Sequence, residues 1–193
     1  PGGVGGERSG KLAAPIPIYA TGKPTVSENF TPQNGEEPSD ERPRLVLDTN
    51  TVLALWMFHD PKLDALHAWI EAGSCWLYSR PHALEELRRV LAYRQFGLDL
   101  HRQEAIHCHY RSLLTPWAGL RGPSATDESA CLPRCSDIDD QKFLEIAFEA
   151  QATHLLTRDK ELLKLQRPVA SRMRCSIMRP DSFKNGFHRH QDA

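Results

Sequence analysis

The sequence predicts an α/β domain built on a mainly parallel sheet, and three observations support this prediction. Four short apolar runs are spaced along the chain from residue 44 onward. The segments between them have helical periodicity and are long enough to cross back over a sheet, and strands joined by such crossovers pair in parallel. The chain has 193 residues, 40% of them apolar, which suits one domain of roughly 150 residues with an extension.

The N-terminal segment differs in composition from the rest of the chain. Residues 1–43 contain seven of the 12 glycines and seven of the 14 prolines. Such a stretch has too little apolar area to compensate the entropy lost on ordering. We therefore expect a disordered tail over 1–43, a folded domain over 44–184 and a frayed end over 185–193.

The first half of the domain is predicted to contain two strands and four helices. The apolar runs over 44–48 and 75–78 have the length of buried strands. Capping residues or a proline stand at several of the helix starts, and Gly73 stands where the second helix should end. The helices are expected over residues 51–58, 60–73, 83–92 and 99–114.

The second half begins with a long connection and then alternates again. Residues 115–136 contain three prolines and two glycines, so no regular element is expected there. The remaining elements follow in the order helix, strand, helix and strand, over residues 139–148, 154–157, 159–165 and 175–178. This alternation supports the α/β class.

Charge and cysteine content exclude several kinds of protein. Lys and Arg number 24 against 25 Asp and Glu, so bulk charge does not indicate a polyanionic partner, although a local basic face remains compatible with it. The sequence contains no run of 18 apolar residues, so no transmembrane helix is predicted. Five cysteines at irregular spacing do not form a secreted disulfide framework. We therefore expect a cytoplasmic protein that does not enter membranes.

Acidic residues cluster where the sheet would present a site. Asp48 ends the first predicted strand and Asp159 follows the third, while Asp140 opens a helix and Glu86 lies in the helix after the second strand. Ligands of open α/β sheets bind outside the carboxyl ends of the strands. Converging carboxylates repel one another, and oxygen ligands select hard cations. The pattern predicts Mg²⁺ or Mn²⁺ as cofactor.

Four motifs stand in order along the chain, and they are Val46–Asn50, Ala83–Leu91, Asp137–Glu145 and Leu155–Lys160. Each motif alone is a weak signal, but their order and spacing over residues 44 to about 184 are specific. Together they resemble the motifs of the PIN-domain ribonucleases, in particular the bacterial branch of VapC-like toxin components of toxin–antitoxin systems. The resemblance implies a three-layer α/β/α sandwich and hydrolysis of RNA phosphodiester bonds that depends on Mg²⁺ or Mn²⁺. It also implies that the chain forms a dimer and that an antitoxin protein is its partner.

The resemblance also assigns roles to single residues. The four catalytic and metal-binding acids that it implies are Asp48, Glu86, Asp140 and Asp159. Glu86 would hold a water or a second ion and help to deprotonate the nucleophile. The supporting residues are Asn50, which orients Asp48 or its water, Thr157, whose hydroxyl holds the site, and Asp137. Glu85 remains an alternative to Glu86, and Asp137 and Asp139 remain register alternatives to Asp140.

Basic residues and thiols near these motifs allow further interpretations. Arg88 and Arg89 lie along one predicted helix, and Arg158 lies between Thr157 and Asp159, so all three are candidates for contacts with RNA phosphates. A zinc site could be built from two cysteines and two histidines, but their spacing is not that of a zinc ribbon, and we expect plain thiols. Those four residues are Cys131, Cys135, His107 and His109.

Each acid taken alone has an ordinary structural explanation, because Asp caps helices and acidic first turns complement the helix dipole. Their occurrence together favours a metal site. Two other functions remain open: a non-catalytic RNA-binding or assembly module with the same fold, and a phosphotransfer enzyme of the haloacid dehalogenase or receiver type. The second is disfavoured because Asn50 stands where such a phosphatase needs a second Asp.

Overall fold

The computed structural model describes residues 42–117 and 132–183, so the predictions for the N-terminal tail and for the C-terminal end beyond residue 183 concern segments outside the described residues. Four strands form one sheet in the order β2-β1-β3-β4, and every pair of neighbours is parallel. This confirms the predicted α/β class. The strands are β1 (Arg44–Leu47), β2 (Trp76–Tyr78), β3 (His154–Leu156) and β4 (Ser176–Met178).

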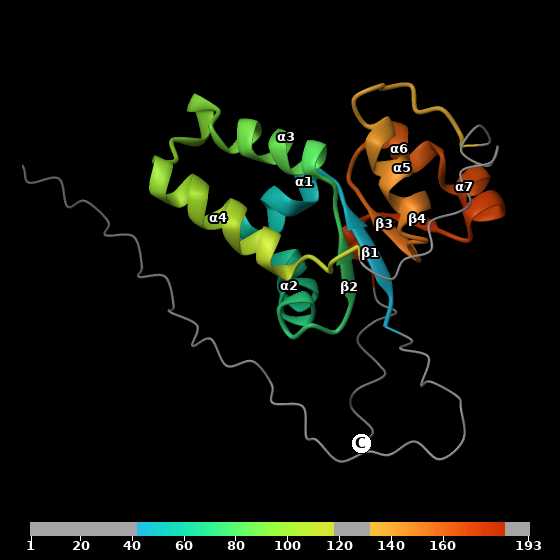
Figure 1. Cartoon of the computed structure of the whole chain (residues 1–193), viewed down its shortest axis with the longest axis horizontal. Coiled ribbons are helices and arrows are strands. Elements are labelled where there is room, and N and C mark those ends of the chain that lie inside the picture. Colours follow the sequence, from blue (N-terminus) through green and yellow to red (C-terminus); the bar gives the residue numbers. More distant parts are fainter. Residues whose placement is uncertain (1–41, 118–131, 184–193) are drawn as a thin grey trace, which may run out of the picture. The chain divides into compact units, whose positions relative to one another are not determined.

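Helices cover both faces of this sheet (Figure 1). The elements of the first half pack on one face and those of the second half on the other. The first group comprises α1 (Thr49–Val52), the π-helical turn η1 (Leu53–Met57), η2 (Pro61–Leu63), α2 (Asp64–Glu71), α3 (Pro81–Leu91), η3 (Arg94–Phe96) and α4 (Leu100–Leu113). The second comprises α5 (Gln141–Glu149), α6 (Lys160–Lys164) and α7 (Gln166–Met173). The short turn η5 (Pro180–Ser182) is an exception, because it contacts η2 and the following Phe183 packs into the core of the first group.

Two separate hydrophobic cores result from the alternation of side chains along the strands. In β1, Leu45 and Leu47 pack into the core under α1 to α4, whereas Val46 packs into the core under α5 to α7. All three side chains are almost completely buried. A strand buried on both faces needs apolar residues at successive positions, and Leu45, Val46 and Leu47 form such a run in β1. The arrangement is consistent with a three-layer sandwich.

The strand order creates a switch point between β1 and β3. The chain passes from β1 to β2 on one side, and β3 then lies on the other side of β1. Crevices at the carboxyl ends of such strands are where open α/β sheets bind ligands. Asp48 follows β1 and Thr157 follows β3, so both predicted site residues come directly after strands that flank this point.

The predicted helices are found with small shifts at their ends. The first begins at Thr49 and continues as the π-helical turn η1, and the second starts with the turn η2 after the cap Asp60. Gly73 has a φ of 68°, a left-handed conformation that ends this helical segment. Helix α7 is not among the predicted helices, because a proline such as Pro168 argues against a helix unless it lies in the first turn. Pro168 is the third residue of α7, in the first turn, where a missing backbone N–H breaks no helical hydrogen bond. Among the described residues, no helix combines the length and apolar character needed to cross a bilayer.

We expect Leu144→Ala to lower the free energy of unfolding by about 2–5 kcal/mol, because Leu144 is completely buried under the sheet. Leu100→Ala is the control, since its side chain is 82% exposed and its loss should change stability by less than about 0.5 kcal/mol. Urea unfolding at constant pH measures both. Equal losses for the two variants would contradict the described core.

Candidate active site

Asp48 is a buried carboxylate held at the end of β1. Its side chain is 2% exposed. Oδ1 accepts the backbone N–H of Thr51 at 2.6 Å, and Oδ2 accepts the hydroxyl of Thr157 at 2.5 Å. Burial raises the pKa of Asp48, and these hydrogen bonds oppose that rise. The charged form is therefore held in a defined orientation, and among the described residues no positive charge is found to compensate its desolvation.

Thr157 joins two of the predicted acids. Its buried hydroxyl donates to Asp48 and accepts the backbone N–H of Asp159 at 2.9 Å. Asp159 in turn caps α6, because its Oδ1 accepts the N–H groups of Glu161 and Leu162 at 2.7 and 3.2 Å. The capping role and a ligand role are compatible, since the cap uses only one of the two carboxylate oxygens.

Asp140, at the start of α5, lies within electrostatic reach of three other carboxylates. Its pKa is raised to about 6, first by desolvation and then by the negative charges of Asp159, Asp137 and Asp48. Asp140 is therefore within electrostatic reach of Asp48 and Asp159, although Asp48 comes from the other half of the domain. We call these three residues and Asp137 the carboxylate cluster.

Glu86 is positioned beside this cluster by two neighbours of the predicted acids. The hydroxyl of Thr49, the residue after Asp48, donates to Glu86 Oε1 at 2.8 Å. Lys142, two residues after Asp140, forms an ion pair with Glu86 Oε2. Glu85 points to solvent on the same helix and is exposed. Of the two alternatives left open by the sequence, Glu86 is the one that faces the site.

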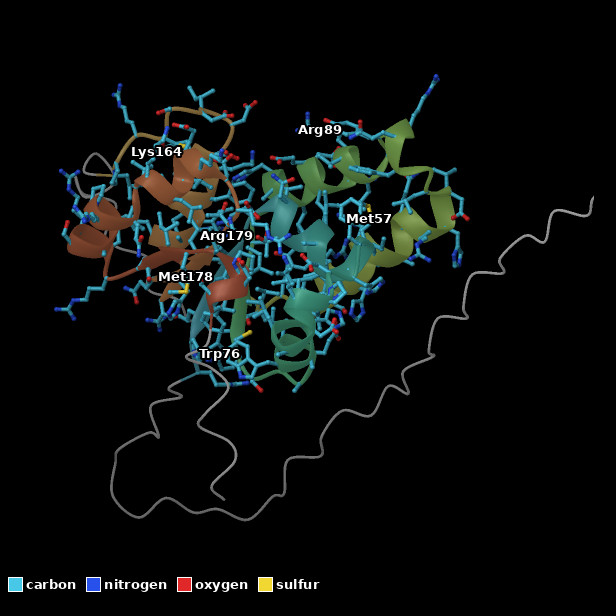
Figure 2. All side chains as sticks on the ribbon, turned by 180° about the vertical axis from the view of Figure 1, so that it is seen from behind. Met57, Trp76, Arg89, Lys164, Met178 and Arg179 are labelled. Atoms are coloured by element: carbon cyan, nitrogen blue, oxygen red, sulfur yellow. The ribbon has the colours of Figure 1, made fainter. Side chains whose placement is uncertain are left out.

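The remaining predicted residues have different surroundings. Asn50 is exposed in the first turn of α1, and Asp137 is exposed and accepts the backbone N–H of Asp139 at 2.9 Å. Arg88 and Arg89 are both exposed on α3, and Figure 2 shows Arg89 at the surface of this helix. Their proposed role in binding RNA phosphates remains a prediction.

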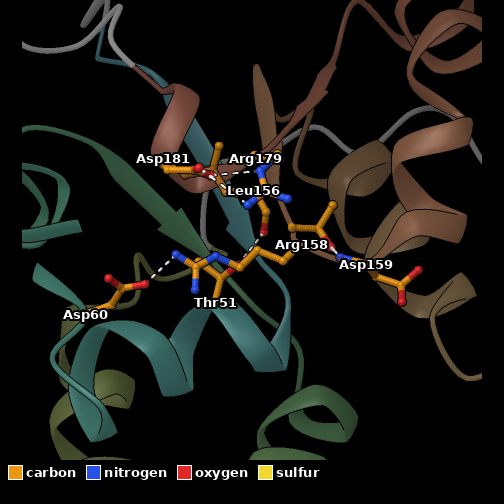
Figure 3. A network of polar contacts seen from close by, with 8 residues as sticks. Thr51, Asp60, Leu156, Arg158, Asp159, Arg179 and Asp181 are labelled. Atoms are coloured by element: carbon orange, nitrogen blue, oxygen red, sulfur yellow. Dashed lines mark hydrogen bonds and ion pairs between the residues drawn. The ribbon is translucent and has the colours of Figure 1, made fainter. Parts of the chain in front are cut away.

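Arg158 is directed away from the carboxylate cluster. Its guanidinium donates to Asp60 Oδ2 at 2.6 Å, and Figure 3 shows it extending from the backbone on the side opposite to Asp159. The Arg158 side chain is thus engaged by Asp60 in this structure, and its contact with a substrate phosphate remains a prediction. Its backbone N–H contributes instead, as one of the hydrogen bonds that favour charged Asp48.

Sequence reasoning missed two residues that contact the predicted acids. Thr49 and Lys142 both lie inside the motifs and bind Glu86 from different layers of the fold. Their closeness in sequence to Asp48 and Asp140 was the available signal. Of the alternative zinc set, His109 contacts Glu71 at 2.8 Å, and Cys131 lies outside the described residues.

The donor set suits a hard divalent cation. Its members are carboxylate oxygens, and the like charges that raise the pKa of Asp140 would be relieved by a cation between them. Within residues 42–117 and 132–183, no three His, Cys, Asp or Glu side chains already form a closed group around one point. The residue types and charges therefore fit the ion, while the side chains are not arranged as a finished coordination shell.

Comparison with known families agrees with this geometry. The model of the PIN domain matches residues 44–161, which is more than half of the chain and includes all four predicted acids. The chain therefore belongs to the PIN-domain family, whose members are generally nucleases and typically use divalent metals. No curated protein and no solved structure gives a significant match.

We expect metal-free wild-type protein to lose stability relative to Asp140→Asn as the pH rises from 4 to above 6. The pKa of Asp140 is raised from 3.8 to about 6, so folding disfavours its charged form. This penalty is absent well below pH 4, grows between the two values and is complete above pH 6. Urea unfolding in EDTA at several pH values measures the difference.

The exposed neighbour Asp139, changed to Asn, is the matched control for this titration. It removes the same charge one residue earlier in the chain. A stability difference between wild type and Asp140→Asn that does not change with pH would show that Asp140 is not desolvated among like charges.

Proposed function

We propose that the protein is an endoribonuclease that hydrolyses RNA phosphodiester bonds with Mg²⁺ or Mn²⁺ as cofactor. The observation that carries this proposal is that Thr157 links Asp48 to Asp159 at the switch point of a PIN-domain sheet, with Asp140 within electrostatic reach of both. A second line of support is that the site is held by the fold itself, because the ends of β1 and β3 are joined through Thr157.

The chain would hold the cation through three carboxylates. Asp48 is fixed by Thr51 and Thr157, and Asp159 is fixed by the first turn of α6. A divalent cation at such a site activates water as a nucleophile and neutralises charge on the scissile phosphate. The hydrogen bonds keep the carboxylates in place before substrate arrives, so little reorganisation is needed during the reaction.

Glu86 would act on the attacking water, and Asn50 would orient Asp48 or its water. Thr49 holds one oxygen of Glu86, and this carboxylate belongs to α3 while the other acids belong to the ends of β1 and β3 and the start of α5. A carboxylate at this position can accept a proton from water during attack. Asn50 is exposed one turn from Asp48 and is available to bind a water.

The motif similarity to VapC-like proteins supports a role as the toxin of a type II toxin–antitoxin pair. In that role the partners are an RNA substrate, an antitoxin protein and a second copy of the chain. The exposed arginines of α3 support contact with an RNA backbone. A non-catalytic RNA-binding module is the alternative outcome of the experiment below.

We expect Asp48→Asn and Glu86→Gln to lower cleavage of a single-stranded RNA roughly 10²–10⁴-fold, because each removes a carboxylate from the site but keeps its shape. Asp48→Asn should stay folded, since an uncharged buried group avoids the desolvation penalty of the carboxylate. Glu85→Gln is the matched control, because it changes the exposed neighbour on the same helix.

Cleavage of a fluorescent RNA in Mg²⁺, in Mn²⁺ and in EDTA measures these effects, with circular dichroism as the check on folding. Full activity in EDTA would contradict the metal-dependent mechanism. Binding of RNA without turnover under all three conditions would favour the non-catalytic module instead.

A further inference from the structure

One ion pair connects the two layers at the site. Lys142 of α5 contacts Glu86 of α3, and their side chains are only 17% and 22% exposed. The ammonium of Lys142 also donates to the backbone carbonyl of Asp139. Since Thr49 occupies the other oxygen of Glu86, both oxygens of this carboxylate have partners within the protein.

The same ammonium acts on the carboxylate cluster. Its positive charge lowers the pKa of Asp140, against the three negative charges and the desolvation that raise it. Lys142 is thus near Asp140 as well as in contact with Glu86. A compact point charge of this kind is what a small cation would supply between the two carboxylates.

We propose that Lys142 takes the place of a second metal ion, so that the domain binds one divalent cation where the four acids alone would bind two. This inference rests on the proposed function and defines its metal stoichiometry. Asp48, Asp140 and Asp159 hold the single ion, and Glu86 is held by Thr49 and Lys142 instead of by a metal.

Charge repulsion supports one ion over two. The ammonium of Lys142 already lies against Glu86 and lowers the pKa of Asp140. A second divalent ion would lie next to this ammonium, which is only 17% exposed. Like charges at such short range are strongly unfavourable where solvent screens them poorly.

The test counts bound ions directly. Mn²⁺ binding to the full chain is followed by electron paramagnetic resonance and by isothermal titration calorimetry, for wild type, Lys142→Met and Lys160→Met. Methionine keeps the length of the stem and removes the charge. Lys160 is the matched control, because it is an exposed lysine directly after Asp159. We expect one ion for wild type and Lys160→Met, and two for Lys142→Met.

Two ions in wild type, or one ion in Lys142→Met, would overturn the inference while leaving the nuclease proposal intact. No bound Mn²⁺ in wild type would contradict the metal-dependent function itself, so the two failures are distinguishable. If Lys142→Met does not fold, Lys142→Gln replaces it, because the amide can still donate to Glu86 and to the carbonyl of Asp139 without carrying a charge.

Discussion

The hydrogen bond from Thr157 to Asp48 is the interaction on which the site depends. It joins the residues that follow two neighbouring parallel strands, and the same hydroxyl accepts the N–H of Asp159. Both groups are buried, so the bond acts where water does not compete and an unpaired partner would be costly. The position of two acids is therefore determined by the pairing of β1 with β3, which the hydrophobic cores on both faces enforce.

A concentration of like charge is the consequence of this architecture. The sheet places carboxylates where desolvation raises the pKa of Asp48, and where desolvation together with neighbouring negative charges raises the pKa of Asp140. Such an arrangement lowers the stability of the folded protein. Carboxylates whose pKa values are shifted in this way are typical of functional sites. Capping of α1 and α6 by Asp48 and Asp159 offsets part of this cost, so the same side chains support the helices and form the site.

The sequence alone predicted the parallel sheet, most of the helices and three acids that meet, because apolar periodicity and strand-end position are local signals. It favoured Glu86 only through the resemblance and kept Glu85 as an alternative, since that choice depends on which face of α3 meets Thr49. It also could not show that Asp60 engages Arg158, because that pair joins residues almost 100 positions apart. Contacts between the two helical layers, such as that of Lys142 with Glu86, depend on how the helices pack. They leave no pattern within a single segment of the sequence.

The pairing of Arg158 with Asp60 has a consequence for the connection that carries Thr157 and Asp159. Arg158, the middle residue of this connection, binds Asp60 at the start of the turn that precedes α2 (Figure 3). Asp181 adds negative charge near Arg158 and is itself bound by Arg179. A residue from the first half of the domain thus restrains the backbone between Thr157 and Asp159. Tolerance to amino-acid change should therefore be low at Asp60 as well, although it lies outside the catalytic set.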